Sequence, residues 1–139
     1  NKGVTREDEI KQKAREIGFD SVKITTANAP EHAEQQAAWL NAGMHGEMAY
    51  LQNRAGLCSG PLSSPNLLNE AKSVIMVALS YNFPVTEPQE NGFGVVARYA
   101  RGTDYHTIFW DKLKMLGAWI EEAFPGNKTR GFCDSGPIR

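Results

Sequence analysis

The chain has 139 residues and a mass of 15.3 kDa, the size of one globular domain with a real hydrophobic core. Its 15 basic and 16 acidic residues give a net charge of -1, which excludes a strongly basic nucleic-acid coat. Hydrophobic residues make up 41% of the sequence and charged residues 22%, a composition that excludes disorder. No apolar run reaches the roughly 18 residues of a membrane span.

The cysteine content favours a reducing cytoplasm. Cys58 and Cys133 are too few for a disulfide framework and too few for an all-cysteine metal site. The chain starts without Met and stops at Arg139 directly after an apolar run. We therefore expect it to be a piece of a longer protein.

The first predicted element is a helix over residues 5–18. Thr5 and Asp8 have the spacing of a capping box, in which each side chain bonds the backbone N–H of the other residue. Apolar residues then recur at helical intervals, and Gly18 stands where a helix commonly ends.

A strand and two further helices are expected next. Residues 21–25 alternate and are rich in β-branched side chains, which predicts a strand. Pro30 opens a second helix in its first turn, and Gly43 closes it. A short third helix is expected over residues 47–53.

The second half of the chain alternates apolar runs with loops. The apolar run 73–79 predicts a strand buried on both faces, at the centre of a sheet covered by helices. Shorter strands are expected at 94–99 and 130–133. The longest helix begins at Asp104 and ends before Pro125, with an apolar stripe of Phe109, Leu113, Leu116 and Ile120. This alternation predicts an α/β domain of two or three layers.

Residues 98–106 are the densest group of reactive side chains and lie between a predicted strand and the longest helix. Ligands of α/β proteins bind where such turns meet at the carboxyl ends of strands. The alternative is ordinary: Asp104 caps the helix, the aromatic side chains pack on its first turn, and the arginines are solvated. The candidates are Arg98, Tyr99, Arg101, Asp104, Tyr105 and His106.

Two further places could carry chemistry. Asp134 directly follows an apolar run, and partial burial would raise its pKa so that the carboxyl group could act as a general acid. It could equally initiate a turn with the Ser, Gly and Pro that follow it. His45 and Glu47 lie at a predicted helix start, but no two histidines have metal-ligand spacing, so we expect His45 to be packed or solvated.

These motifs resemble the epoxyqueuosine reductase family. The specific part is Arg-Tyr-Ala-x-Gly-x-Asp-Tyr-His at 98–106, followed by the amphipathic helix and by Phe-Cys-Asp-Ser-Gly-Pro at 132–137. The matching order and spacing extend to residues 17–20, 45–48 and 71–75. The resemblance thus covers nearly the whole chain.

The resemblance implies an oxidoreductase that reduces the epoxide of epoxyqueuosine to queuosine at the wobble position of tRNA. It implies cobalamin as cofactor and two 4Fe–4S clusters that relay electrons from an external donor. The enzyme would act in the cytoplasm and would have no membrane partner. It also implies a nitroreductase-like, cobalamin-binding α/β domain, with a central sheet covered by helices. Residues 1–139 would be the N-terminal part of this domain, and the ferredoxin-like cluster domain would lie downstream.

The resemblance also assigns roles to residues. Asp134 would be the proton donor, and Arg98, Asp134 and Ser135 would contact cobalamin. The anticodon stem-loop of tRNA would be bound by Tyr99, Arg101, Asp104, Tyr105 and His106. Two cysteines cannot hold even one four-cysteine cluster, so no metal is expected on these residues and the fragment alone is expected to be inactive.

An alternative stays open. The chain could be a truncated or degenerate relative that binds a corrinoid or another protein without doing redox chemistry. The stretch Leu62, Ser63 and Ser64 favours this alternative, because the family usually has a basic residue shortly before the proline that matches Pro65. The cluster domain missing from this chain points the same way.

Overall fold

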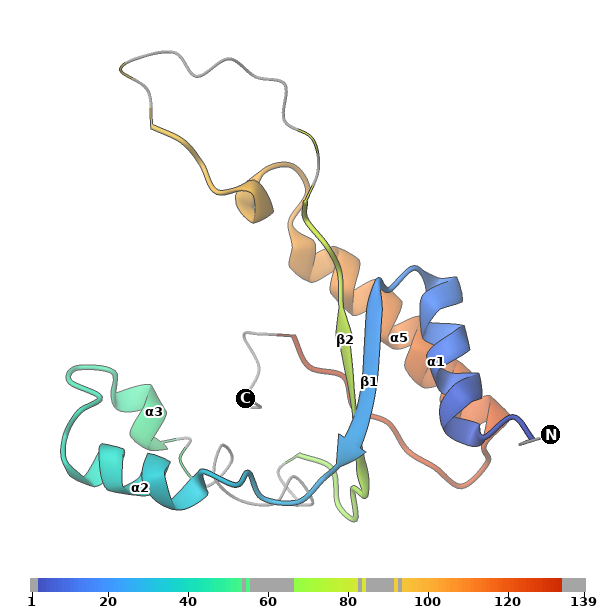
Figure 1. The fold of residues 1–139 in the computed structure, drawn as a ribbon, viewed down its shortest axis with the longest axis horizontal. Coiled ribbons are helices and arrows are strands. Elements are labelled where there is room, and N and C mark those ends of the chain that lie inside the picture. Colours follow the sequence, from blue (N-terminus) through green and yellow to red (C-terminus); the bar gives the residue numbers. More distant parts are fainter. Residues whose placement is uncertain are drawn as a thin grey trace.

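The structure is a computed structural model that describes residues 3–53, 55, 67–82, 84, 92 and 94–133. Figure 1 shows two strands side by side, with two helices packed along them. The elements are α1 (Arg6–Ile17), β1 (Ser21–Thr26), α2 (Ala33–Asn41), α3 (Ala49–Asn53), β2 (Ser73–Ala78), the 3-10 turn η1 (Arg98–Ala100) and α5 (Tyr105–Ala123).

Helix α1 begins and ends as predicted. The backbone N–H of Asp8 donates to Thr5 Oγ1 at 3.2 Å, and the backbone N–H of Thr5 donates to Asp8 Oδ2 at 3.1 Å, which completes the capping box. Thr5 Oγ1 also donates to Asp8 Oδ2 at 2.6 Å, and this bond, followed by the one from the Thr5 backbone N–H, lowers the pKa of the Asp8 carboxyl group. Gly18 ends the helix with φ of 96°, a left-handed conformation that favours glycine.

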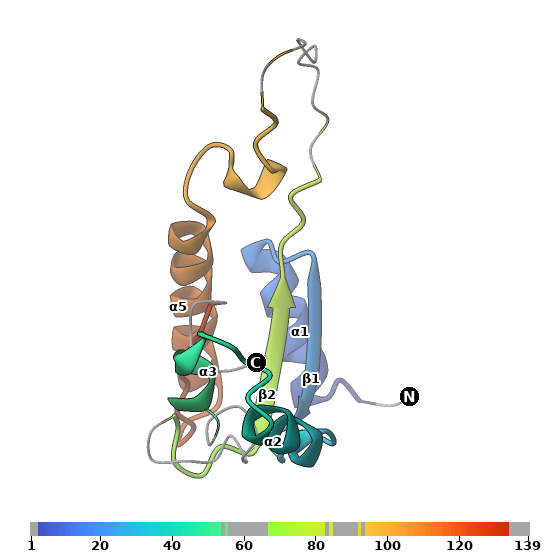
Figure 2. The ribbon, with the colours of Figure 1, turned by 90° about the vertical axis from the view of Figure 1, so that its left-hand side faces the viewer.

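The two strands form an antiparallel sheet, with Val22 opposite Val77 and Ile24 opposite Ile75. The prediction that β2 is buried on both faces was wrong, because the side chain of Met76 is 58% exposed. Successive side chains of a strand point to opposite faces, and α1 and α5 cover the face that carries Ile75 and Val77. Figure 2 shows α1 behind the strands and α5 beside them. The expected helix-covered sheet is therefore covered on one face within the described residues.

The core lies between this sheet face and the two helices. The predicted stripe of α5 is confirmed: Leu116 and Ile120 are buried, and Phe109 and Leu113 pack against them. Helix α5 is also tied to the end of α1, because Lys112 Nζ donates to the backbone oxygen of Ile17. Together, α1, β1, β2 and α5 are called the body below. Its buried residues are Ala14, Phe19, Val22, Leu116 and Ile120.

Two of the four expected strands were not found. Residues 94–97 have no regular structure and lead into η1, and residues 130–133 run without strand pairing. Val95 and Val96 are 69% and 58% exposed, so their strand propensity finds no pleated surface to pack on. Helix α2 begins at Ala33, later than predicted, because Pro30 accepts a turn hydrogen bond from Ala33 N before the helix starts.

None of the described helices could cross a lipid bilayer. Within the described stretches, no helix combines the length and the hydropathy that a membrane span requires.

Candidate functional site

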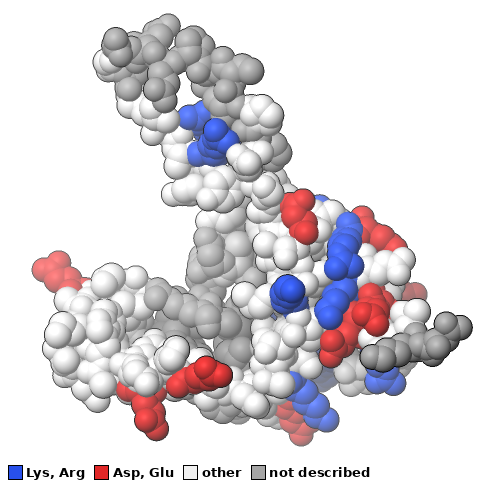
Figure 3. Space-filling view, viewed as in Figure 1, with Lys and Arg blue, Asp and Glu red and all other residues white. Residues whose placement is uncertain are grey.

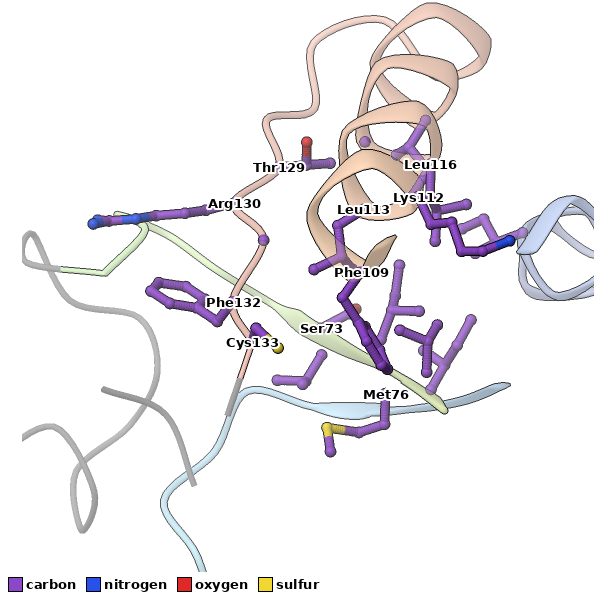
Figure 4. A pocket seen from close by; sticks show the side chains of 18 of the residues that line it. Ser73, Met76, Phe109, Lys112, Leu113, Leu116, Thr129, Arg130, Phe132 and Cys133 are labelled. Atoms are coloured by element: carbon purple, nitrogen blue, oxygen red, sulfur yellow. The ribbon is translucent and has the colours of Figure 1, made fainter. Parts of the chain in front are cut away.

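An open hollow of about 2600 Å³ lies between β2, α5 and residues 129–133. Figure 4 shows Phe109 and Leu113 of α5 facing the strands, with Phe132 and Cys133 on the neighbouring segment. The floor of the hollow is therefore apolar and belongs to the body, and residues 129–133 form one wall.

The second wall belongs to a projecting segment. Residues 80–82 and 94–103 belong to the connection from β2 to α5 and are called the arm (Figure 1). The arm and the first turn of α5 place four candidate residues from the sequence on the hollow: Arg98, Tyr99, Arg101 and Tyr105. They also place there three residues that the sequence analysis did not select: Ser80, Tyr81 and Asn82.

Asp104 is the N-cap of α5, as its sequence position predicted. Its Oδ1 accepts from the backbone N–H of His106 at 2.9 Å and also lies 2.9 Å from His106 Nδ1. The same carboxylate thus caps the helix and orients the imidazole ring. Both residues are described, but neither lines the hollow, whereas Tyr105 between them does.

Four aromatic rings run from the arm onto α5. Tyr81 meets Tyr99 edge to face at 6.1 Å between ring centroids, and Tyr99 meets Tyr105 in the same way at 6.2 Å. Tyr105 is stacked on His106 at 4.2 Å. Tyr81 and Tyr99 are 58% and 54% exposed, so part of their aromatic surface is open to solvent.

Both arginines of the arm have fixed orientations. Arg98 Nη1 donates to Asn82 Oδ1 at 2.7 Å, which joins the two described halves of the arm. Arg101 Nε donates to the backbone oxygen of Val96 at 2.9 Å. Figure 3 shows the resulting group of basic side chains on the projecting arm.

The segment that leads toward Asp134 is anchored to α5. Thr129 donates from its backbone N and from Oγ1 to Glu121 Oε1, at 2.7 and 2.8 Å. These bonds, first that of the side chain, lower the pKa of the Glu121 carboxyl group. Gly117 permits the approach, since a Cβ there would lie 2.7 Å from Thr129 Oγ1. Arg130 Nη1 donates to the backbone oxygen of Leu67.

Asp134 and Ser135 lie outside the described residues, so the structure leaves their predicted roles open. The residue before them is described: Cys133 is buried at 9% exposure, as expected for a small apolar side chain, and it lines the hollow. Cys58 also lies outside the described residues. The expected packing of His45 is found, since it is half-buried against the Trp39 ring at 6.4 Å.

A large cofactor of mixed polarity fits this hollow. Its volume exceeds the roughly 300–1,000 Å³ of an ordinary small-molecule pocket. Its floor would cover the apolar part of such a group, and Arg98, Arg101 and Tyr99 could bond polar substituents at the edge. No group of three or more His, Cys, Asp or Glu side chains in the described stretches could hold a metal ion.

The fold and the site define an α/β protein with a ligand hollow under an arginine- and tyrosine-bearing arm. Residues 63–135 match the family model described as epoxyqueuosine reductase QueG, DUF1730. The chain therefore belongs to the epoxyqueuosine reductase family, and the resemblance seen in the sequence is confirmed.

Relatives and a solved structure agree with this assignment. The epoxyqueuosine reductase of Gloeobacter violaceus is 38% identical over 133 residues, which cover 94% of this chain and 40% of the relative. That of Escherichia coli is 35% identical, covering 93% of this chain and 34% of the relative. The structure of the Streptococcus thermophilus epoxyqueuosine reductase is 27% identical, with a TM-score of 0.73, and the match covers 96% of this chain and 36% of that one. The chain thus spans about two fifths of the first relative's length.

Three of the residues missed in the sequence could have been selected by the rule already used for residues 98–106, that ligands bind at the carboxyl ends of strands. Ser80, Tyr81 and Asn82 directly follow the carboxyl end of β2, where ligands of α/β proteins bind. Glu121 and Thr129 gave no signal, because their contact depends on how the chain turns after α5.

Proposed function

We propose that this chain is the N-terminal part of the catalytic domain of an epoxyqueuosine reductase. The complete enzyme would reduce the epoxide of epoxyqueuosine to queuosine at the wobble position of tRNA, in the cytoplasm. The observation that carries the proposal is the family motif at 98–106, whose arginines and tyrosines line the same hollow as Cys133, the neighbour of Asp134. The relatives bear the name of an enzyme, so the non-catalytic alternative is not favoured.

The cofactor in this proposal is cobalamin, held in a nitroreductase-like domain. When bound and reduced, it supplies electrons to the epoxide carbon. Arg98 and Ser135 would hold polar groups of the cofactor, and the body would cover its apolar part. The electrons would come from an external donor through two 4Fe–4S clusters, whose ligands must lie elsewhere because this chain has two cysteines.

Asp134 would supply the proton to the epoxide oxygen while the carbon–oxygen bond breaks. Without that proton an alkoxide would have to form in a partly dry site, which is costly. Partial burial would raise the pKa of the Asp134 carboxyl group and so keep it protonated near neutral pH. Asp134 would then also lie close enough to contact the cofactor.

The tRNA substrate would be bound at the arm and the first turn of α5. Tyr99 and Tyr105 offer rings on which unpaired bases of the anticodon loop could stack. Arg101 would contact phosphate groups, and Asp104 and His106 would bond polar groups of the modified base. The net charge of -1 means that the attraction for RNA must be local.

The test is reduction by the full-length protein. Purified protein with cobalamin, a strong reductant and epoxyqueuosine-containing tRNA should yield queuosine, detected by mass spectrometry of the digested tRNA. Omitting cobalamin should abolish the product, and residues 1–139 alone should give no more product than a control without protein. A full-length protein that yields no queuosine under these conditions would contradict the proposal.

A further inference from the structure

Residues 129–133 pass along α5 without strand pairing, so individual contacts hold them in place. Thr129 makes two of these contacts. Its backbone N–H and its hydroxyl group both donate to Glu121 Oε1, at 2.7 and 2.8 Å. Hydrogen bonds to an ionised acceptor are roughly twice as strong as those between neutral groups. The carboxylate of Glu121 therefore fixes both the backbone and the side chain of Thr129.

Two glycines bring this segment close to the helix. A Cβ on Gly117 would lie 2.7 Å from Thr129 Oγ1, and a Cβ on Gly131 would lie 3.3 Å from Leu113 Cβ. Leu113, Gly117 and Glu121 follow one another at intervals of four residues on α5, so they share one face of the helix. The segment thus runs back along this face, antiparallel to α5 (Figure 4).

The position of this segment limits where Asp134 can lie. Cys133 is buried and lines the hollow, and consecutive Cα atoms of a chain are about 3.8 Å apart. A general acid has to be within hydrogen-bond reach of the atom that it protonates. A misplacement of about 1 Å can slow a reaction about 10²-fold. A contact that holds residues 129–133 in place can therefore set the rate of a step that uses the next side chain.

We propose that Glu121 is a positioning residue for the proton donor: it holds Thr129, and through residues 129–133 it sets the place from which Asp134 acts. The inference rests on the proposed function, which assigns the proton to Asp134. Glu121 does not line the hollow, whereas Thr129 does, so Glu121 acts through Thr129 and not on a ligand. The alternative is that this contact only adds stability to the fold.

The experiment compares variants of the full-length protein. Glu121→Ala, Thr129→Val and the double variant remove the contact, Thr129→Ser retains the hydroxyl group, and Glu122→Ala is the control on the next residue. Two functional quantities are measured: the single-turnover rate of epoxide reduction with reduced cofactor already bound, and the Kd for epoxyqueuosine-containing tRNA. The third quantity is the rate at which iodoacetamide alkylates Cys133, followed by mass spectrometry of its peptide, which needs no turnover.

The expected result is a slower chemical step without weaker binding. Glu121→Ala should slow the single turnover about 10- to 100-fold, the cost of a misplaced group. It should speed the alkylation of Cys133 at least about threefold, because a released segment opens more often. The Kd for tRNA should stay unchanged. Thr129→Val should act in the same direction but more weakly, since its backbone N–H remains, and Thr129→Ser should behave as wild type. The double variant should match Glu121→Ala within about twofold.

Gly117→Ala tests the same contact from the other side. The added Cβ would displace the Thr129 hydroxyl group, while alanine favours a helix more than glycine does. A slower turnover together with faster alkylation of Cys133 is expected here too, and it could not result from a weaker α5.

A wild-type turnover rate in Glu121→Ala would overturn the inference, as would a slow turnover with unchanged alkylation of Cys133. Equal losses in Glu122→Ala, or a weaker Kd for tRNA with an unchanged turnover rate, would also overturn it. If the wild-type full-length protein makes no queuosine, the proposed function is contradicted, whereas the alkylation of Cys133 still decides whether Glu121 holds residues 129–133.

Discussion

In the body, Ala14, Val22 and Leu116 are 0%, 5% and 3% exposed, whereas in the arm Tyr81 and Tyr99 are 58% and 54% exposed. The body is stabilised by removing apolar side chains from water. The arm is shaped by individual polar bonds, such as that between Arg98 and Asn82. This difference suits the proposed function, in which the body keeps one shape while the arm would present polar and aromatic groups to a ligand.

The largest effect on stability is expected from the core of the body. Leu116→Ala should lower the free energy of unfolding by about 2–5 kcal/mol, because it leaves a cavity where α5 packs on the sheet. Met115→Ala, one residue earlier and 59% exposed, is the control and should change stability by less than about 0.5 kcal/mol. Denaturant unfolding measures both values. Equal losses would mean that the body is not organised around this core.

A smaller effect is expected where the arm joins α5. Asp104→Ala removes the acceptor of the His106 N–H and should cost about 1 kcal/mol of stability. Asp104→Ser keeps a capping oxygen but removes the carboxylate that orients the His106 ring, so it should retain most of the stability. If the alanine and serine variants unfold alike, capping is not what Asp104 contributes to the fold.

The smallest effect concerns the anchor of residues 129–133. The pKa of Glu121 is lowered in the folded state by its bonds to Thr129, so its contribution to stability is present above the unfolded pKa and lost as pH falls through the folded pKa. The melting temperature of wild type minus that of Glu121→Gln should therefore shrink between about pH 6 and pH 3, around the ordinary carboxyl pKa of about 4.3. Glu122→Gln, on the next residue, is the control. A melting-temperature difference that stays constant over this pH range would contradict a stabilising role for the bonds between Glu121 and Thr129.

The body and the arm also differ in how much of their structure could be predicted from the sequence. The stripe of α5 and the caps at Thr5 and Asp104 depend on residues close in sequence, and the structure confirms them. The strand expected at 94–99 failed because Val95 and Val96 have no neighbouring strand to pair with in the described residues. Strand propensity depends on such neighbours, and one sequence does not supply them.

The candidate site likewise contains residues that the sequence predicted and residues that it did not. The motif at 98–106 pointed to Arg98, Tyr99, Arg101 and Tyr105, which the structure brings to one hollow. Asn82 was missed because its partner is 16 residues away and the bond depends on how the arm folds back. No periodicity encodes that contact, whereas the position of Asn82 after a strand end could have suggested it.

The central claim is that this chain contributes the proton donor of an epoxide reduction, and Asp134→Asn in the full-length protein tests it most directly. The substitution keeps the shape of the side chain but removes its titratable proton. Single-turnover reduction with reduced cofactor already bound isolates the chemical step from electron delivery. The account predicts a rate lower by roughly 10²–10⁴-fold, the usual contribution of a positioned general acid, with cobalamin still bound. A rate within about threefold of wild type, as expected if Asp134 only forms a turn that Asn also favours, would contradict it.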